Sequence, residues 1–267
     1  MNQATLAIYA NCAEAMFDPA VRNPPLDSRM AADWKILGYL TARNALFNAQ
    51  ALGLGDSAYY GFIAASLADP LNCIVVIRGT ELPIEWLENI EAFFYPHPKF
   101  GQVEAGFWSI YCSMRIDGNG SIPFAHCIAS FVPIGGTVTV IGHSLGAALA
   151  TYLLADLAGA TNDLTVRGAL FASPKPGNAK FADGVDAALG GANNYTAAAY
   201  LRDIVPHVPV SLPFGLGFQS LPATQWIKPA DAKAVIHNNP ECNHNALSYA
   251  AMLGAQIQGQ TCILGAN

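Results

Sequence analysis

A five-residue motif between two segments of opposite structural preference constrains this chain most. Residues 142–146 read GHSLG, after the β-branched run TVTVI at 137–141 and before the alanine-rich stretch that continues to residue 158. A β-branched run favours a strand, and alanine and leucine favour a helix. A serine at such a junction adopts a strained backbone that pushes its hydroxyl out of the sheet, and the flanking glycines leave room for close packing. We therefore predict that Ser144 is a nucleophile.

Further segments extend this strand-and-helix pattern along the chain. Short strand-like runs occur at 59–65, 73–78, 166–171 and 196–201, and the first two are separated by a turn signal that predicts a hairpin. The segments up to residue 47, at 103–114 and at 245–258 read as helical. Strands that alternate with helices predict an α/β fold with a mainly parallel central sheet flanked by helices. Because no repeat or low-complexity linker interrupts it, we expect residues 1–267 to form a single domain.

The composition excludes several function classes. Hydrophobic residues make up 52% of the chain and charged residues only 12%, about half the usual charged share of roughly 25%. A net charge of −6 argues against nucleic acid as a partner. No run of eighteen uncharged apolar residues suggests a transmembrane segment. Residues 1–17 contain no Lys or Arg, so we expect no signal peptide within this chain.

A serine hydroxyl needs a base to take its proton and a third group to orient that base. In this type of fold the partners follow the serine in the order acid, then histidine. Asp203 is the downstream acid that directly follows a hydrophobic strand-like run. His207 lies only four residues further along, between prolines, and is expected to support that loop. His244 immediately precedes the last predicted helix and is the preferred base, with His237 as the alternative.

Several segments together resemble the filamentous-fungal-type triacylglycerol lipases (lipase class three), which have the α/β-hydrolase fold. The matching segments are VVIRGT at 75–80, GF at 106–107, IGHSLGAALA at 141–150, FASPKPGN at 171–178, RDIVPHVP at 202–209 and WI at 226–227, followed by His244 and Tyr249. They span roughly residues 55–255 in the order of the family. The chain departs from the family at Glu104, where histidine is usual, and at residues 217–222.

The resemblance implies a catalytic triad of Ser144, Asp203 and His244. It also implies an oxyanion hole, formed by the backbone N–H of Leu145 and by the N–H and hydroxyl of Thr80. Such preorganised donors typically contribute about 3–4 kcal/mol each to transition-state stabilisation. This chemistry requires neither a cofactor nor a metal ion.

Residues 81–98 predict an amphipathic helix next to Thr80, with glutamates on one face and apolar residues on the other. The apolar positions include Trp86, Leu87, Ile90 and Phe94. This helix resembles the lid of the family, which covers the site in water and exposes apolar surface at a lipid interface. The alternative is an ordinary surface helix packed on the core. Val205, Leu212 and Phe214 are candidates for the wall of an acyl-chain pocket.

The chain has six cysteines, and no pair shows the CxxC spacing of a structural zinc site. Cys73 lies in an apolar strand-like run and is expected to be a buried free thiol. Cys12 and Cys262 lie near opposite ends of the chain, as a disulfide that ties the termini in secreted relatives would. The compartment is not determined by the residues, and the family resemblance suggests secretion.

Together these features predict a serine hydrolase that acts as a monomer at a lipid–water interface on lipid esters such as triacylglycerols, through an acyl-enzyme. The alternatives on the same scaffold are a phospholipase A, an esterase for short-chain or aromatic acids, and acyl transfer to an alcohol. An alternative of another class is a hydrolase-fold binding protein without catalysis.

Overall fold

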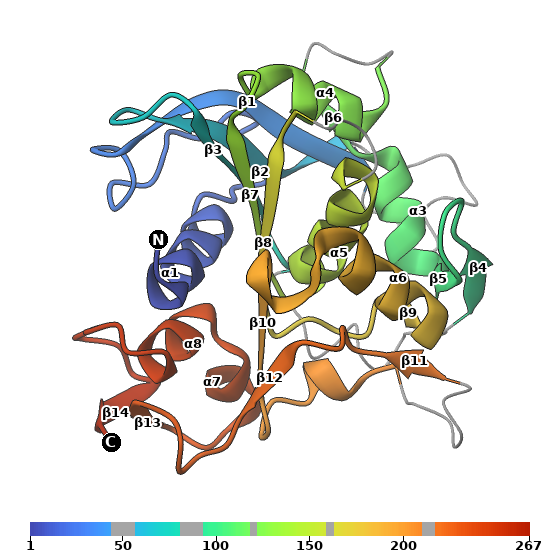
Figure 1. Cartoon of the computed structure of the whole chain (residues 1–267). Coiled ribbons are helices and arrows are strands. Elements are labelled where there is room, and N and C mark those ends of the chain that lie inside the picture. Colours follow the sequence, from blue (N-terminus) through green and yellow to red (C-terminus); the bar gives the residue numbers. More distant parts are fainter. Residues whose placement is uncertain (44–56, 81–92, 118–121, 159–162, 210–216) are drawn as a thin grey trace.

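The computed structural model describes residues 1–43, 57–80, 93–117, 122–158, 163–209 and 217–267 (Figure 1). In these ranges, eight strands form one sheet in the order β12-β10-β8-β7-β3-β2-β1-β6. Neighbours from β3 to β12 are parallel, and β2, β1 and β6 extend the sheet in antiparallel pairs. The strands are β1 (Trp34–Arg43), β2 (Ser57–Ser66), β3 (Asn72–Ile77), β6 (Arg115–Ile116), β7 (Thr137–His143), β8 (Thr165–Phe171), β10 (Tyr195–Tyr200) and β12 (Thr224–Ile227). The predicted mainly parallel α/β architecture is confirmed.

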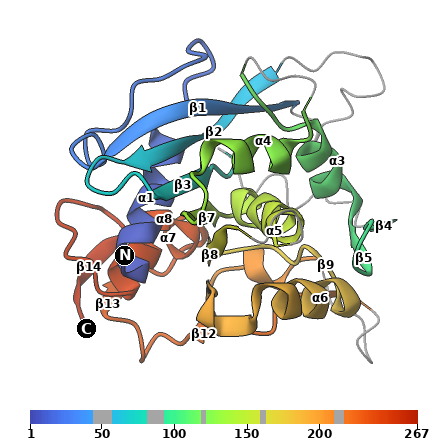
Figure 2. The same ribbon diagram turned by 45° about the horizontal axis from the view of Figure 1, so that its top comes forward.

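Helices cover both faces of this sheet, each over its own apolar core (Figures 1 and 2). On one face lie the N-terminal and C-terminal helices, which are α1 (Gln3–Ala15), α7 (Pro240–His244) and α8 (Ala246–Met252). On the other lie α3 (Ala105–Ser113), α4 (Phe124–Phe131), α5 (Leu145–Leu157) and α6 (Ala179–Leu189). The two chain ends therefore meet on one side of the sheet, and α1 packs against α8.

Two smaller sheets lie outside the central one. One has the order β11-β9-β5-β4, and β13 pairs with β14 in the other. Their strands are β4 (Phe94–Pro96), β5 (Gln102–Glu104), β9 (Gly177–Asn178), β11 (Phe218–Gln219), β13 (Ala234–Ile236) and β14 (Ile263–Ala266). Short 3₁₀ helices occupy Gly191–Asn193 and Val205–His207. Among the described residues, none of the helices has the length and apolar character to cross a membrane.

Comparison of the predicted with the observed helices and strands shows where the local sequence pattern is sufficient to predict secondary structure. The predicted hairpin is confirmed, because β2 and β3 pair antiparallel. The expectation of helix up to residue 47 is correct for α1 but wrong for Trp34–Arg43, which pairs with β2 along its length. The helix expected from residue 103 begins at Ala105, since Val103 and Glu104 pair with β4. Tertiary pairing overrides the local preference at both places.

The predicted lid lies mostly outside the described residues. Residues 81–92, with Trp86, Leu87 and Ile90, fall there, as do the pocket candidates Leu212 and Phe214. Phe94 is described, and its prediction as part of the amphipathic helix is wrong. It lies in β4 opposite Glu104, and its ring stacks on Phe218 with 4.1 Å between ring centroids.

Candidate active site

Ser144 occupies a sharp turn between the end of β7 and the start of α5. Its φ of 56° and ψ of −133° are a strained conformation for a residue with a side chain. The turn is held in place because the Ser144 N–H donates to the Phe171 carbonyl at 3.0 Å and its own carbonyl accepts from the Ala147 N–H at 2.9 Å. The structure therefore holds the Ser144 side chain at the carboxyl end of a parallel strand.

The two glycines of the motif allow this turn to form. A Cβ at Gly142 would lie 2.3 Å from the carbonyl oxygen of Gly146, and a Cβ at Gly146 would lie 2.2 Å from that of Ile77. Both distances are well below van der Waals contact, and both involve backbone that cannot move aside. Glycine at these positions therefore lets the start of α5 approach the end of β3.

His244 and Asp203 complete a hydrogen-bonded chain that begins at Ser144. The Nε2 atom of His244 lies 2.8 Å from Ser144 Oγ, and its Nδ1 atom lies 2.8 Å from Asp203 Oδ2. All three residues are buried. Asp203 follows β10, and His244 is the last residue of α7. The fold thus brings together three side chains that are far apart in the sequence.

The Asp203 carboxylate is further fixed by its own partners. Its Oδ1 accepts from the Val205 N–H at 3.0 Å, and its Oδ2 accepts from the Tyr249 hydroxyl at 2.8 Å. The Tyr249 hydroxyl in turn accepts from the Tyr200 N–H at 2.8 Å. These contacts leave the carboxylate one orientation, in which it accepts a hydrogen bond from the Nδ1–H group of His244.

The charge state of His244 follows from its surroundings. Burial lowers the pKa of His244, and the hydrogen bond and negative charge of Asp203 oppose this only in part, so that its pKa stays below the ordinary value. A lowered pKa keeps the imidazole neutral at neutral pH. With Nδ1 protonated toward Asp203, Nε2 is the nitrogen that can take the proton of Ser144.

The other two candidate histidines lie elsewhere. His237 is exposed, its ring Nδ1 atom is hydrogen-bonded to the Asn239 side chain, and its backbone N–H donates to the Cys262 carbonyl. His207 is also exposed and packs its ring against Trp226 at 4.9 Å. Neither takes part in the hydrogen-bonded chain with Ser144.

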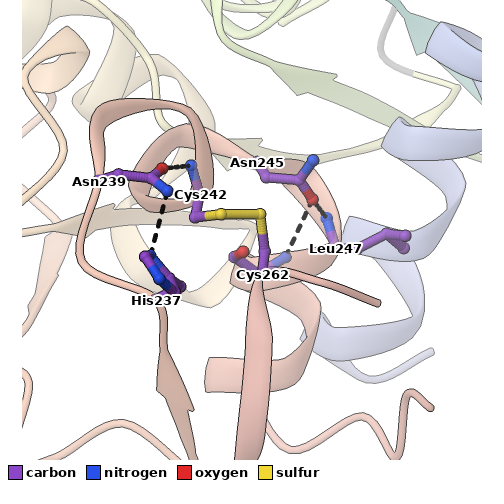
Figure 3. The surroundings of a disulfide bond; sticks show 7 residues. His237, Asn239, Cys242, Asn245, Leu247 and Cys262 are labelled. Carbon is purple, nitrogen blue, oxygen red and sulfur yellow. Dashed lines mark hydrogen bonds between the residues drawn. A yellow bond between two sulfur atoms is a disulfide. The ribbon is translucent and has the colours of Figure 1, made fainter. Parts of the chain in front are cut away.

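A disulfide secures the segment that carries His244 (Figure 3). Cys242 of α7 is bonded to Cys262, and the Asn239 side chain caps α7 by accepting from the Cys242 N–H at 2.7 Å. The pairing of Cys12 with Cys262 expected from the resemblance is therefore wrong. Cys12 is a buried free thiol on α1, whereas the pairing of β13 with β14 brings Cys262 beside α7. The free buried thiol predicted at Cys73 is confirmed.

The loop after β3 lies against the serine turn and ends at Thr80. A Cβ at Gly79 would lie 3.0 Å from the Ser144 Cβ. Arg78 supports this loop by donating to the carbonyls of Tyr59 at 2.7 Å and Gly79 at 2.8 Å. The Thr80 hydroxyl oxygen is buried and has no hydrogen-bond partner among the described residues. Leu145 is the first residue of α5, where backbone N–H groups are unpaired.

Two glutamates, one partly buried beside the site and one buried on the other face of the sheet, were not predicted to be functional. Glu14 of α1 lies with its Oε1 atom 2.7 Å from Nδ1 of His143, the residue before the nucleophile candidate. The signal available was that Glu14 is the one charged residue of α1. Glu104 caps α3 by accepting from the Phe107 N–H at 2.7 Å. Within the described ranges, no group of three or more His, Cys, Asp or Glu side chains could hold a metal ion.

Comparison with known proteins places this geometry in a family. The model of the family described as Lipase (class 3) matches residues 74–212, more than half of the chain. The secreted mono- and diacylglycerol lipase LIP4 of Malassezia restricta is 42% identical over 196 residues, which cover 72% of this chain and 58% of that protein. Phospholipase A1-II 6 of Oryza sativa is 26% identical over 197 residues, covering 61% and 48% of the two chains. The chain thus spans less than two thirds of these relatives.

Solved structures show the same fold. The lipase from Rhizopus microsporus var. chinensis superposes with a TM-score of 0.62 at 24% identity, over 84% of this chain and 74% of that one. M37 lipase superposes with a TM-score of 0.66 at 17% identity, over 95% and 91% of the two chains. The family match covers the Ser144 turn, the Thr80 loop and Asp203, and the chain therefore belongs to the lipase (class 3) family.

Proposed function

We propose that this chain hydrolyses carboxylic esters of lipids through a covalent acyl-enzyme. One observation supports the proposal above all others, namely the two 2.8 Å hydrogen bonds that connect Ser144 Oγ through His244 to Asp203. A buried serine on a strained turn, in contact with a neutral imidazole oriented by a carboxylate, is the arrangement required for acyl transfer.

The proposed reaction has two halves. Ser144 Oγ attacks the ester carbonyl while its proton passes to His244 Nε2, and the oxyanion that forms accepts hydrogen bonds from the Leu145 N–H and from Thr80. The tetrahedral intermediate collapses when His244 protonates the departing alcohol, leaving an acyl ester on Ser144. Water then attacks this ester, His244 takes its proton, and the acid is released as the proton returns to Ser144.

Mono-, di- or triacylglycerols are the proposed substrates, taken from a lipid–water interface. The Malassezia restricta relative, a secreted mono- and diacylglycerol lipase, supports this class and also secretion. The residues beside Asp203 agree with it, because Leu201 and Ile204 expose large apolar side chains. We further propose residues 81–92 as a lid, Val205 as part of an acyl pocket and a monomer as the working form.

A second candidate is phospholipid hydrolysis. It is favoured by the resemblance to phospholipases A1 of Oryza sativa and Arabidopsis thaliana, the latter 28% identical over 152 residues. The chemistry at Ser144 would be the same, and only the leaving group would differ.

Labelling and turnover together test the proposal. A fluorophosphonate probe is expected to label the wild type and not Ser144→Ala, and mass spectrometry locates the adduct. Rates are then measured on p-nitrophenyl esters of increasing chain length and on emulsified mono-, di- and triacylglycerols and phospholipid vesicles. Absence of labelling in the folded wild type would favour a binding protein, and a phospholipid rate above every acylglycerol rate would favour the second candidate.

A further inference from the structure

Glu14 of the N-terminal helix contacts the back of the candidate active site. It is the one charged residue of α1, and its Oε1 atom lies 2.7 Å from Nδ1 of the buried His143. The ring of His143 lies beside that of His244, with 4.7 Å between centroids, and edge-on to Tyr249 at 5.9 Å. His143 therefore forms part of the surface on which the His244 ring rests.

The same carboxylate also contacts the loop that carries Thr80. Glu14 lies close to Gly79, because a Cβ on Gly79 would lie only 3.2 Å from Glu14 Oε1, and the Gly79 backbone helps to lower the pKa of Glu14. One side chain from α1 thus touches both the residue beneath the proposed base and the peptide that precedes the proposed oxyanion donor.

Charge strengthens the hydrogen bond between Glu14 and His143. Burial lowers the pKa of His143, but the charge and hydrogen bond of Glu14, with smaller contributions from Asp203 and the His244 backbone, outweigh burial and raise it. Burial raises the pKa of Glu14, but the charge and hydrogen bond of His143, with smaller contributions from His244 and the Gly79 backbone, outweigh burial and lower it. Both shifts favour an ion pair between the two side chains, which resists displacement.

We propose that Glu14 is a positioning residue for the ester hydrolysis put forward above. It fixes His143 beneath the His244 ring and the Gly79 peptide before Thr80, so that the base and the oxyanion donor keep their places around Ser144. The inference depends on that proposed function. The competing explanation is an ion pair that only attaches α1 to the sheet.

Two conservative variants separate the effect of the length of the Glu14 side chain from the effect of its charge. Glu14→Gln keeps an acceptor at the same reach and removes the charge, whereas Glu14→Asp keeps the charge and withdraws it by one methylene. Because small misplacements of reacting groups cost up to about 100-fold in rate, we expect Glu14→Asp to lower kcat by roughly 10- to 100-fold. For Glu14→Gln we expect a loss below about 5-fold, and for both an unchanged KM.

The matched control is Asn11→Ala. Asn11 also lies on α1, where its Oδ1 atom accepts from Arg29 at 2.9 Å, so this variant removes one tertiary hydrogen bond of α1 away from the site. It is expected to keep the wild-type kcat. Thermal melts establish the temperature at which all variants are folded, and kcat and KM are measured there on a p-nitrophenyl ester.

The possible results are distinct. A kcat for Glu14→Asp within 2-fold of Asn11→Ala, or a kcat for Glu14→Gln as low as that of Glu14→Asp, would overturn the positioning role. A wild type that the fluorophosphonate fails to label would instead overturn the proposed hydrolysis itself. Should Glu14→Asp not fold, the ratio of kcat between Glu14→Gln and Asn11→Ala decides, since a loss above 5-fold contradicts the dependence on reach.

Discussion

Two clusters on opposite faces of the sheet each contain a histidine and a glutamate, His143 with Glu14 and His97 with Glu104, whose pKa values are shifted in opposite directions. In the site cluster, defined as Glu14, His143 and His244, the carboxylate and His143 touch, and the pKa of His143 is raised while that of Glu14 is lowered. In the aromatic cluster, defined as His97 and Glu104 with the rings around them, burial lowers the pKa of His97 and raises that of Glu104.

The difference lies in the partners. His97 is packed against the rings of Phe100, Trp108 and Phe181, and its Nδ1 accepts from the backbone N–H groups of Lys99 and Phe100. Glu104 accepts from the start of α3. Burial penalises the charged form in both clusters, and only a charged contact at hydrogen-bonding distance reverses it. A buried histidine or glutamate is thus not by itself a sign of function.

The largest expected contrast concerns two buried acids. Asp203→Asn should lower kcat by about 10³- to 10⁴-fold, because the amide cannot hold His244 in the tautomer that leaves Nε2 free to accept a proton. Glu104→Gln, in the aromatic cluster, should leave kcat within about 3-fold. Both are measured on a p-nitrophenyl ester with active sites counted by a fluorophosphonate. A comparable loss in the two variants would remove the functional distinction between Asp203, which holds His244 of the site cluster, and Glu104 of the aromatic cluster.

The sequence predicted the parts of the site that follow from local pattern and chain order. Its glycines and flanking segments predict Ser144 as the nucleophile, and places after a strand and before a helix predict Asp203 and His244 as its partners; the structure brings these three side chains together. The contact of Glu14 with His143 could not be predicted, because the two are 129 positions apart and neither segment specifies its partner. The strand at Trp34–Arg43 and the pairing of Cys242 with Cys262 were missed for the same reason.

A covalent bond supports the segment of the site cluster that carries His244. Cys242 and Cys262 are 20 positions apart, and closing a loop of this size in the unfolded chain contributes about 3 kcal/mol. The double variant Cys242→Ala/Cys262→Ala should therefore lose about this much free energy of unfolding in urea titrations. Cys112→Ala removes an exposed free thiol and should change the free energy by less than about 0.5 kcal/mol. Equal losses in the two variants would show that the disulfide does not stabilise the fold.

A smaller change in the free energy of unfolding is expected when pH is lowered, and it comes from His97 of the aromatic cluster. The pKa of His97 is lower in the folded protein than in the unfolded chain, so the unfolded state binds the proton first as pH falls. The contribution of neutral His97 to the free energy of unfolding is therefore at its maximum above the ordinary histidine pKa of about 6.5. It decreases as pH falls below that value. Urea titrations at pH 7.5 and 5.5 should show a larger loss for the wild type than for His97→Asn. Equal losses in the two proteins would mean that His97 does not contribute to the pH dependence of the free energy of unfolding.

The smallest expected effect is the pH dependence that the site cluster gives to the free energy of unfolding. Its sign is opposite to that of the aromatic cluster. Because the pKa of His143 is raised in the folded protein, its contribution to stability is complete below the unfolded value and is lost as pH rises through the folded value. Glu14→Gln removes the carboxylate that raises this pKa. The difference in free energy of unfolding between wild type and Glu14→Gln, measured by urea titration, should therefore decrease from pH 6 to pH 9. A gap that widens with rising pH would mean that the contact with Glu14 does not stabilise protonated His143, and the two clusters would then respond to burial alike.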